Sequence, residues 1–119
     1  MATFTGMIAS GSTNGKNIKI AATATAGTLL HTATSGTGNT FDEVYAWFTN
    51  TSTAPVSITI EWGGVASPDD HIVKDYTLQP NSPPVPLITG QRLQNSLVVR
   101  CFASTANVVV ANIYHNRVA

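Results

Sequence analysis

Charged residues are scarce in this sequence. They make up 10% of its 119 residues, and six basic side chains balance six acidic ones, whereas about 25% is usual for a soluble domain. The lysines and arginines are scattered, so the clustered positive charge that binds nucleic acid is missing, and we expect no nucleic-acid partner. A near-neutral surface rich in Thr, Ser and Asn also lacks the charge repulsion that keeps monomers apart, which favours assembly.

Cysteine and long apolar runs are equally rare. Cys101 is the only cysteine, which excludes an intrachain disulfide and a zinc site built from cysteines. It alternates with Val99 in one apolar row and is predicted to be a small buried residue. No apolar run approaches the roughly 18 residues of a membrane-spanning helix, so no membrane partner is expected. No basic residue precedes an apolar stretch near the N-terminus, and we expect no secretory signal.

Helical periodicity is missing too, because no long segment keeps a 3.6-residue apolar period. Short β-branched and aromatic runs alternate instead with Gly, Pro and Asn turns. The clearest run, residues 56–62 (VSITIEW), predicts a strand with one face in the core and the other in water. About eight such strands indicate an all-β fold, a single antiparallel β-sandwich of the jelly-roll or immunoglobulin-like kind, with a small barrel as the alternative.

The sandwich domain is expected to span residues 17–119. Residues 1–16 are rich in Gly, Ser and Thr and have neither a helical nor a strand period. We interpret them as a flexible N-terminal arm that becomes ordered by docking on a neighbouring molecule. Its isolated apolar residues Phe4, Met7 and Ile8 are therefore candidate interface residues.

Two aromatic side chains share one face of the strand predicted at residues 41–50. Tyr45 and Trp47 alternate with apolar residues that point to the opposite face. An aromatic pair outside the core is either a protein interface or a platform on which sugar rings stack. Trp62 continues the apolar row of its own strand, so it is predicted to be buried or to pack at the rim, and it is a further candidate interface residue.

No catalytic, cofactor-binding or metal-binding residue is predicted, and the protein is expected not to be an enzyme. The histidines His31, His71 and His115 lie in separate predicted strands without metal-ligand spacing. Each is interpreted as a surface or rim residue, although separated strands can converge in space. The acidic pairs Asp42-Glu43 and Asp69-Asp70 are interpreted as solvated positions. Residue counts leave a Ser-His-Asp triad open, but no nucleophile motif marks one.

Several segments between residues 28 and 115 follow one order of features. A strand ends in an Asn-Thr turn, a regular strand follows, and the step Leu78-Gln79-Pro80 leads to late strands rich in Val, Ile and Ala. The segments are residues 28–32 (TLLHT), 44–53 (VYAWFTNTST), 56–60 (VSITI), 71–78 (HIVKDYTL) and 95–103 (NSLVVRCFA). In this order they resemble small β-sandwich virion proteins of tailed bacteriophages.

The resemblance implies a non-enzymatic structural protein of a phage virion, above all a capsid decoration or cement protein that binds the shell as an oligomer. Its implied partners are further copies of itself, for example in a trimer, and the major capsid protein or other virion proteins. Such a protein is assembled in the host cytoplasm and resides in the virion. The alternative is a neck, tail or fibre-tip module that binds a receptor or a carbohydrate.

Overall fold

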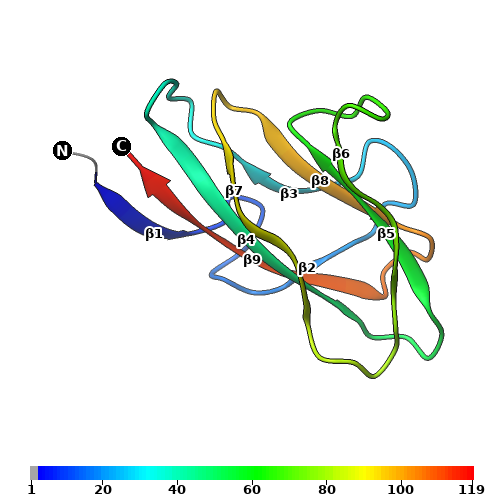
Figure 1. The fold of residues 1–119 in the computed structure, drawn as a ribbon. Coiled ribbons are helices and arrows are strands. Elements are labelled where there is room, and N and C mark those ends of the chain that lie inside the picture. The colour runs from blue at the N-terminus through cyan, green and yellow to red at the C-terminus, as the bar shows by residue number, and fades with distance from the viewer. Residues whose placement is uncertain (1–2) are drawn as a thin grey trace.

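Two antiparallel sheets face each other in the computed structural model, which describes residues 3–119 (Figure 1). One sheet has the order β1-β9-β4-β7, with the short β2 also paired to β9, and the other has the order β3-β8-β5-β6. The strands are β1 (Phe4–Ile8), β2 (Ile18–Lys19), β3 (Thr28–Thr32), β4 (Phe41–Asn50), β5 (Val56–Trp62), β6 (His71–Leu78), β7 (Val85–Leu93), β8 (Val98–Ala103) and β9 (Val109–Val118).

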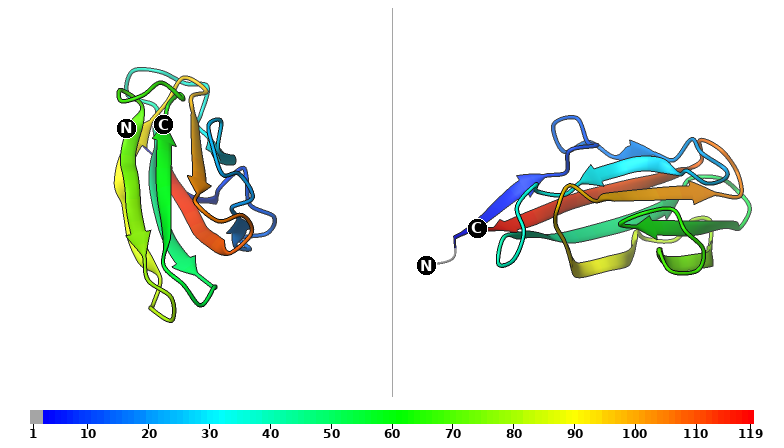
Figure 2. Two further views of the ribbon diagram at one scale, coloured as in Figure 1. Left: turned by 90° about the vertical axis from the view of Figure 1, so that its right-hand side faces the viewer. Right: turned by 90° about the horizontal axis from the view of Figure 1, so that it is seen from above.

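The strand pairing is that of one long hairpin rolled up on itself. β5 pairs with β6, β4 with β7, β3 with β8 and β2 with β9, each antiparallel. Eight strands nested in this way form a jelly roll, so the predicted all-β sandwich is confirmed and its order is not the immunoglobulin-like one. Figure 2 shows the two layers from the side and from above. None of the described residues 3–119 belongs to a helix that could cross a membrane.

The N-terminal segment contains a ninth strand, so the expectation that residues 1–16 lack one is wrong. β1 pairs with the second half of β9, from Phe4 opposite Val118 to Ile8 opposite Tyr114. All five of its residues are exposed, so the strand is held by its backbone bonds rather than by core side chains. An apolar period cannot reveal such a strand. Residues 1–2 of the expected arm lie outside the described residues.

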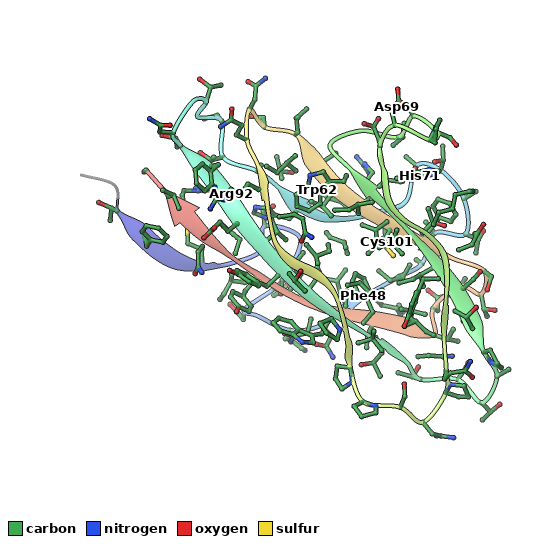
Figure 3. All side chains as sticks on the ribbon, viewed as in Figure 1. Phe48, Trp62, Asp69, His71, Arg92 and Cys101 are labelled. Atoms are coloured by element: carbon green, nitrogen blue, oxygen red, sulfur yellow. The ribbon has the colours of Figure 1, made fainter. Side chains whose placement is uncertain are left out.

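The core fills the space between the sheets. Alternate residues of β4 point into it, and Phe48 is the largest fully buried side chain (Figure 3). Cys101 of β8 is buried, as its alternation with Val99 predicts. Trp62 packs partly buried against this core, in agreement with its prediction as a buried or rim residue.

β5 is buried on both faces, which its alternating pattern does not predict. Thr59 and Glu61 are as buried as the isoleucines beside them. The Thr25 hydroxyl and the Gly27 N–H donate to the Glu61 carboxylate, and the N–H of Asp75 donates to the Thr59 hydroxyl oxygen at 3.1 Å. The alternation correctly separates the apolar from the polar face of β5. The polar face is nevertheless buried, because the segments that contain Thr25, Gly27 and Asp75 cover it and form hydrogen bonds with it.

Candidate functional site

The aromatic residues predicted on β4 lie on the face of their sheet that points away from the second sheet. Tyr45 is in register with Tyr114 of β9. The two ring centroids are 5.2 Å apart, and the centroids of Trp47 and Tyr114 are 5.8 Å apart, with the ring planes inclined by only 15° and 16°. Tyr114 therefore joins the two predicted aromatics into one stacked group. The sequence does not reveal it, because only the pairing of β4 with β9 brings it beside Tyr45.

These rings remain accessible to solvent. Tyr114 is 40% exposed, while Tyr45 and Trp47 are half-buried. The inward residues of β4 pack against the second sheet, so that sheet cannot cover the aromatic side of β4. Whatever covers these rings must come from outside the sandwich.

A groove of about 560 Å³ adjoins the stacked rings. The Nδ2 of Asn112 donates to the Oδ1 of Asn17 at 3.1 Å, which places a pair of side-chain amides beside the aromatic surface. Both amides keep further hydrogen-bonding capacity for a ligand. The groove is lined by Asn17, Trp47, Thr49, Pro84, Val110, Asn112 and Tyr114.

The apolar surface continues across β9 onto β1. Residues directly opposite each other on paired strands share a face, so Ile8 lies beside Tyr114, and Phe4 lies beside Val118 and hence near Phe41. Ile8 is 53% and Phe4 is 67% exposed. We call this surface the outer face and define it by Phe4, Ile8, Phe41, Tyr45, Trp47 and Tyr114.

Two charged side chains beside the outer face are paired within the chain. Glu43 of β4 forms an ion pair with Arg92 of β7 at 3.2 Å. The guanidinium carbon of Arg92 also lies 4.8 Å from the centre of the Phe41 ring, in a cation–π contact. The face therefore offers a partner mainly apolar and aromatic area, and the exposed Lys19, opposite Val110 of β9, adds one positive charge on this side of the sheet.

The structure brings four of the six predicted interface residues together. Phe4, Ile8, Tyr45 and Trp47 share the outer face. Met7 is opposite the inward-pointing His115, so it lies on the other side of β1. Trp62 belongs to β5 in the second sheet and is separate from the group.

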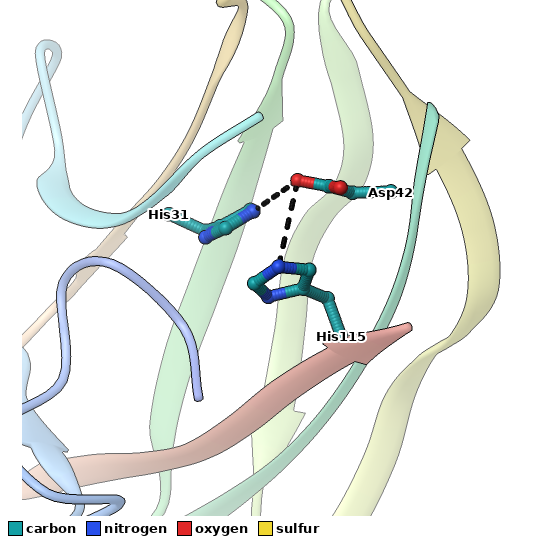
Figure 4. Close-up of side chains that lie close together, drawn as sticks. All are labelled: His31, Asp42 and His115. Atoms are coloured by element: carbon teal, nitrogen blue, oxygen red, sulfur yellow. Dashed lines mark hydrogen bonds and ion pairs between the residues drawn. The ribbon is translucent and has the colours of Figure 1, made fainter. Parts of the chain in front are cut away.

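A second polar group lies between the sheets, where the sequence predicts none (Figure 4). His31 of β3, Asp42 of β4 and His115 of β9 are each at most 1% exposed, so their interpretation as surface, rim or solvated positions is wrong. Arg117 donates to Asp42 from Nε at 2.7 Å and from Nη2 at 3.0 Å. His31 Nε2 lies 2.8 Å from Asp42 Oδ2, and the N–H of Thr34 donates to the same oxygen at 3.0 Å.

His31 is held in one neutral form. The backbone N–H of Ser10 donates to Nδ1 of His31 at 3.0 Å, so Nδ1 carries no proton. The proton is therefore on Nε2, which donates to Asp42. Burial lowers the pKa of His31, although the hydrogen bond to Asp42 opposes this effect.

His115 is buried without a hydrogen bond. Neither of its ring nitrogens has a partner among the described residues, and its Nε2 is 3.7 Å from Asp42 Oδ2. Its ring centroid lies 4.1 Å from that of His31. Burial, and then repulsion from His31, lower the pKa of His115 to about 4. Burial alone would raise the pKa of Asp42, but hydrogen bonds from Arg117 and His31 outweigh it and lower that pKa to about 2.

These three residues form a donor set of a kind that binds metals. Two imidazole nitrogens and one carboxylate oxygen lie within 4.8 Å of one another, which would suit zinc or a similar ion. The hydrogen bonds oppose this use, because Asp42 already accepts from Arg117, His31 and Thr34. Metal binding at His31 Nε2 would also require a proton on Nδ1, facing the N–H of Ser10. The contacts therefore fit a structural network better than a metal centre.

The same contacts place a serine, a histidine and an acid in line. Ser10 Oγ is 3.2 Å from His31 Nδ1, on the opposite side of the ring from Asp42. A hydrolytic triad also needs free N–H donors for the oxyanion, but the N–H groups of residues 10–12 are all bonded within the chain. The Ser10 hydroxyl oxygen accepts from the N–H of Thr32 at 2.7 Å. Ser10 thus ties the segment after β1 to β3.

Residue alternation is the one signal that could have located part of this network. In β9, His115 continues the inward row of Ala111 and Ile113, and in β4, Asp42 begins the inward row of Val44. A histidine or an acid in an inward row predicts burial. It does not predict which residues from other strands will meet it.

The buried network of His31, Asp42 and His115 and the aromatic outer face differ in what they offer a partner. In the buried network, Asp42 and His31 are hydrogen-bonded within the chain and His115 is enclosed between the sheets, whereas the outer face presents aromatic rings and amides to solvent. The outer face is therefore the candidate functional site. Compared with protein-family models, curated proteins and solved structures, the chain matches none of them.

Proposed function

We propose that this protein is a non-enzymatic structural protein of a tailed-phage virion, a capsid decoration or cement protein that binds a protein surface through its outer face. The observation that carries the proposal is the continuity of that face, from Phe4 and Ile8 across Tyr114 to Tyr45 and Trp47. Contiguous apolar patches on soluble proteins mark surfaces that a partner covers. Because the second sheet lies on the opposite side of β4, the partner is another molecule.

The charge distribution supports an apolar contact. The chain has equal numbers of acidic and basic residues, and Glu43 and Arg92 on the outer face neutralise each other. A partner would therefore be recognised by shape and by aromatic contact. Fold alone does not decide the function, since jelly rolls include both viral capsid domains and lectins. The resemblance of residues 28–115 to phage virion proteins favours the capsid role.

Trp47 and Tyr114 are expected to dominate the binding energy. Buried aromatic anchors at the centre of an interface typically cost about 2 kcal/mol or more when they are truncated to alanine. Tyr114 is the central ring of the stacked group, because both Tyr45 and Trp47 contact it. Loss of Tyr114 would also loosen its two neighbours.

Co-sedimentation with purified capsids of the phage that encodes the protein tests the proposal. Trp47→Ala and Tyr114→Ala should each weaken capsid binding by at least about tenfold. Tyr76→Ala is the matched control, because Tyr76 is an aromatic residue of the second sheet that is 43% exposed, and it should bind like the wild type. The proposal fails if the folded wild-type protein does not bind capsids, or if the Trp47 and Tyr114 variants bind as it does.

The groove beside the rings favours a second candidate, carbohydrate binding. Trp47 and Tyr114 could stack on sugar rings while the amides of Asn17 and Asn112 bond to hydroxyl groups. Asn112→Ala separates the two functions, because it removes an amide and leaves the rings in place. If glycans bind the wild type but not this variant, the sugar function is supported. If no glycan binds and the variant still co-sediments with capsids, the capsid role is supported.

A further inference from the structure

The edges of the two sheets are not protected equally. An edge strand presents unpaired backbone groups, and proteins usually block such edges with proline, charge, bulges or covering chain. β7 carries Pro86, and its Thr89 N–H bonds to the side chain of Gln91 at 2.7 Å. β3 is covered by residues 10–11, since the carbonyl of Leu30 accepts the N–H of Gly11 at 3.0 Å. Both of these edges are therefore blocked.

β6 is blocked by other means. It carries Lys74, and Asp75 has a positive φ of 49° and gives its N–H to Thr59. β2 has only two residues, one of which is Lys19. β1 uses none of these devices, because its sequence, FTGMI, has no charge and no proline, and all five residues are exposed. Figure 1 shows β1 at the end of its sheet, beside β9.

The hydrogen-bond pattern shows which backbone groups of β1 are free. Thr3 and Ala119 exchange both backbone bonds, at 2.8 and 3.0 Å. Bonded and non-bonded pairs alternate along an antiparallel ladder, so Thr5 and Met7 also bond to β9. The N–H and C=O groups that point away from β9 belong to Phe4, Gly6 and Ile8.

We propose that this edge pairs with β1 of a second copy of the chain, antiparallel, about a two-fold axis at Gly6. In this register Gly6 is opposite Gly6 of the second copy, and Phe4 is opposite its Ile8. Every outward-pointing N–H and C=O then finds a partner, because each of these pairs exchanges two hydrogen bonds. The two five-stranded sheets join into one, and the outer face becomes continuous across the dimer.

A second copy fits this edge better than an unrelated strand. Two-fold pairing brings like charges together, and β1 has no charge to oppose it. The exposed rings of Phe4 would pack on Ile8 of the second copy. Nothing in the chain itself requires glycine at position 6, because its φ is not positive and an added Cβ would meet only Asn116 Oδ1, at an ordinary 3.5 Å. Gly6→Ala should therefore leave β1 and its free backbone edge unchanged.

In the proposed structural role, the first partner of the chain would be a second copy of itself. The dimer proposal rests on the proposed function only in treating the protein as part of an assembly. The two contacts share Phe4 and Ile8, but different groups anchor them. Dimerisation uses the backbone edge of β1, whereas capsid binding uses the rings of Tyr45, Trp47 and Tyr114. The two can therefore be tested separately.

Gly6→Pro tests the edge pairing directly. Proline removes the outward N–H and places its ring on the free edge, but it costs no bond to β9, because the Gly6 N–H points away from β9. Gly6→Ala is the matched control that keeps the N–H. By analytical ultracentrifugation, wild type and Gly6→Ala should be dimers, and the dimer dissociation constant of Gly6→Pro should rise by at least about tenfold. A cooperative thermal unfolding transition of the proline variant shows that it is folded, although its midpoint can lie below that of the dimeric wild type.

Amide hydrogen exchange of the wild-type protein gives a test that needs no variant. In the dimer the N–H groups of Phe4, Gly6 and Ile8 should exchange as slowly as those of Thr5 and Met7. The proposal is overturned by a wild-type monomer or trimer, by a proline variant that dimerises normally, or by fast exchange at the three outward amides. A wild-type dimer that ignores capsids would refute the proposed capsid role alone, whereas a capsid-binding monomer would refute the dimer alone.

Discussion

Arg117 holds both carboxylate oxygens of Asp42 from the end of β9, at a point where Asp42 is fully buried between the sheets. Such two-point ion pairs are among the stronger polar contacts in proteins. The same carboxylate accepts from His31 of the second sheet, and His31 in turn accepts from Ser10 after β1. One acid thus links both sheets and the N-terminal segment.

Removal of this charge should destabilise the fold. Asp42→Asn loses the ion pair with Arg117 and presents a donor group to His31, so we expect a loss of about 2–4 kcal/mol in the free energy of unfolding. Urea denaturation measures it. Asp69→Asn is the control, because Asp69 is exposed, and it should change stability by less than about 0.5 kcal/mol. Equal stability of the two variants would contradict the structural role of Asp42.

The buried histidines should make stability depend on pH. The pKa of His115 is lowered from 6.5 to about 4, so the unfolded chain takes up a proton before the folded one does. The contribution of neutral His115 to the free energy of unfolding is fully present above pH 6.5. It is lost as the pH falls toward 4, and the loss amounts to at most about 3 kcal/mol. His31, whose pKa is also lowered, adds to the loss. Asp42 contributes little in this window, because its pKa values in the unfolded and folded chain, 3.8 and about 2, both lie below it.

Urea denaturation between pH 7.5 and pH 4.5 checks this dependence. His115→Gln removes one titrating group, so its stability should fall less steeply than that of the wild type as the pH drops. His71→Gln is the control, because His71 is only half-buried, on β6, and lies outside the network. If His115→Gln keeps the full slope, the lowered pKa of His115 is not its cause.

The polar face of β5 is buried, so we expect its residue Thr59 to contribute to stability. The alternation of apolar and polar residues in β5 would instead place Thr59 in water. Thr59 is 1% exposed and accepts the N–H of Asp75. Thr59→Val keeps the shape but removes the acceptor, and it should cost about 1–3 kcal/mol. Ser57→Ala, on the same strand but partly exposed, should cost less than about 0.5 kcal/mol in the same urea experiment. Similar costs for the two variants would mean that the Thr59 bond contributes little.

Local patterns predict the strands, and long-range pairing decides the rest. Alternation in β4 separates the inward Phe48 from the outward Tyr45 and Trp47, and the structure has the same two faces. Neither the jelly-roll order nor the contact of Tyr45 with Tyr114 has a local signature, because both depend on which strands pair and in what register.

The failures of sequence reasoning have two physical causes. β1 is exposed on both faces and is held by backbone bonds, so its side chains carry no apolar period. His31, Asp42 and His115 come from three strands in two different sheets, and their burial is tolerated only because most of their polar atoms find partners after folding. Sequence analysis places polar residues at the surface, because the hydrogen-bond partners that allow their burial become known only from the fold.

Cys101 should be protected from reagents in the native protein. It is fully buried in β8, and burial, together with the nearby Glu61, raises the pKa of its thiol to about 12. Since the thiolate is the reactive form, an aromatic disulfide reagent at pH 8 should label the native chain far more slowly than the chain unfolded in urea. Ser104→Cys adds an exposed thiol close by and should be labelled once, quickly, in the native state. Rapid labelling of native wild-type protein would mean that the sheets open at β8 far more often than this packed core allows.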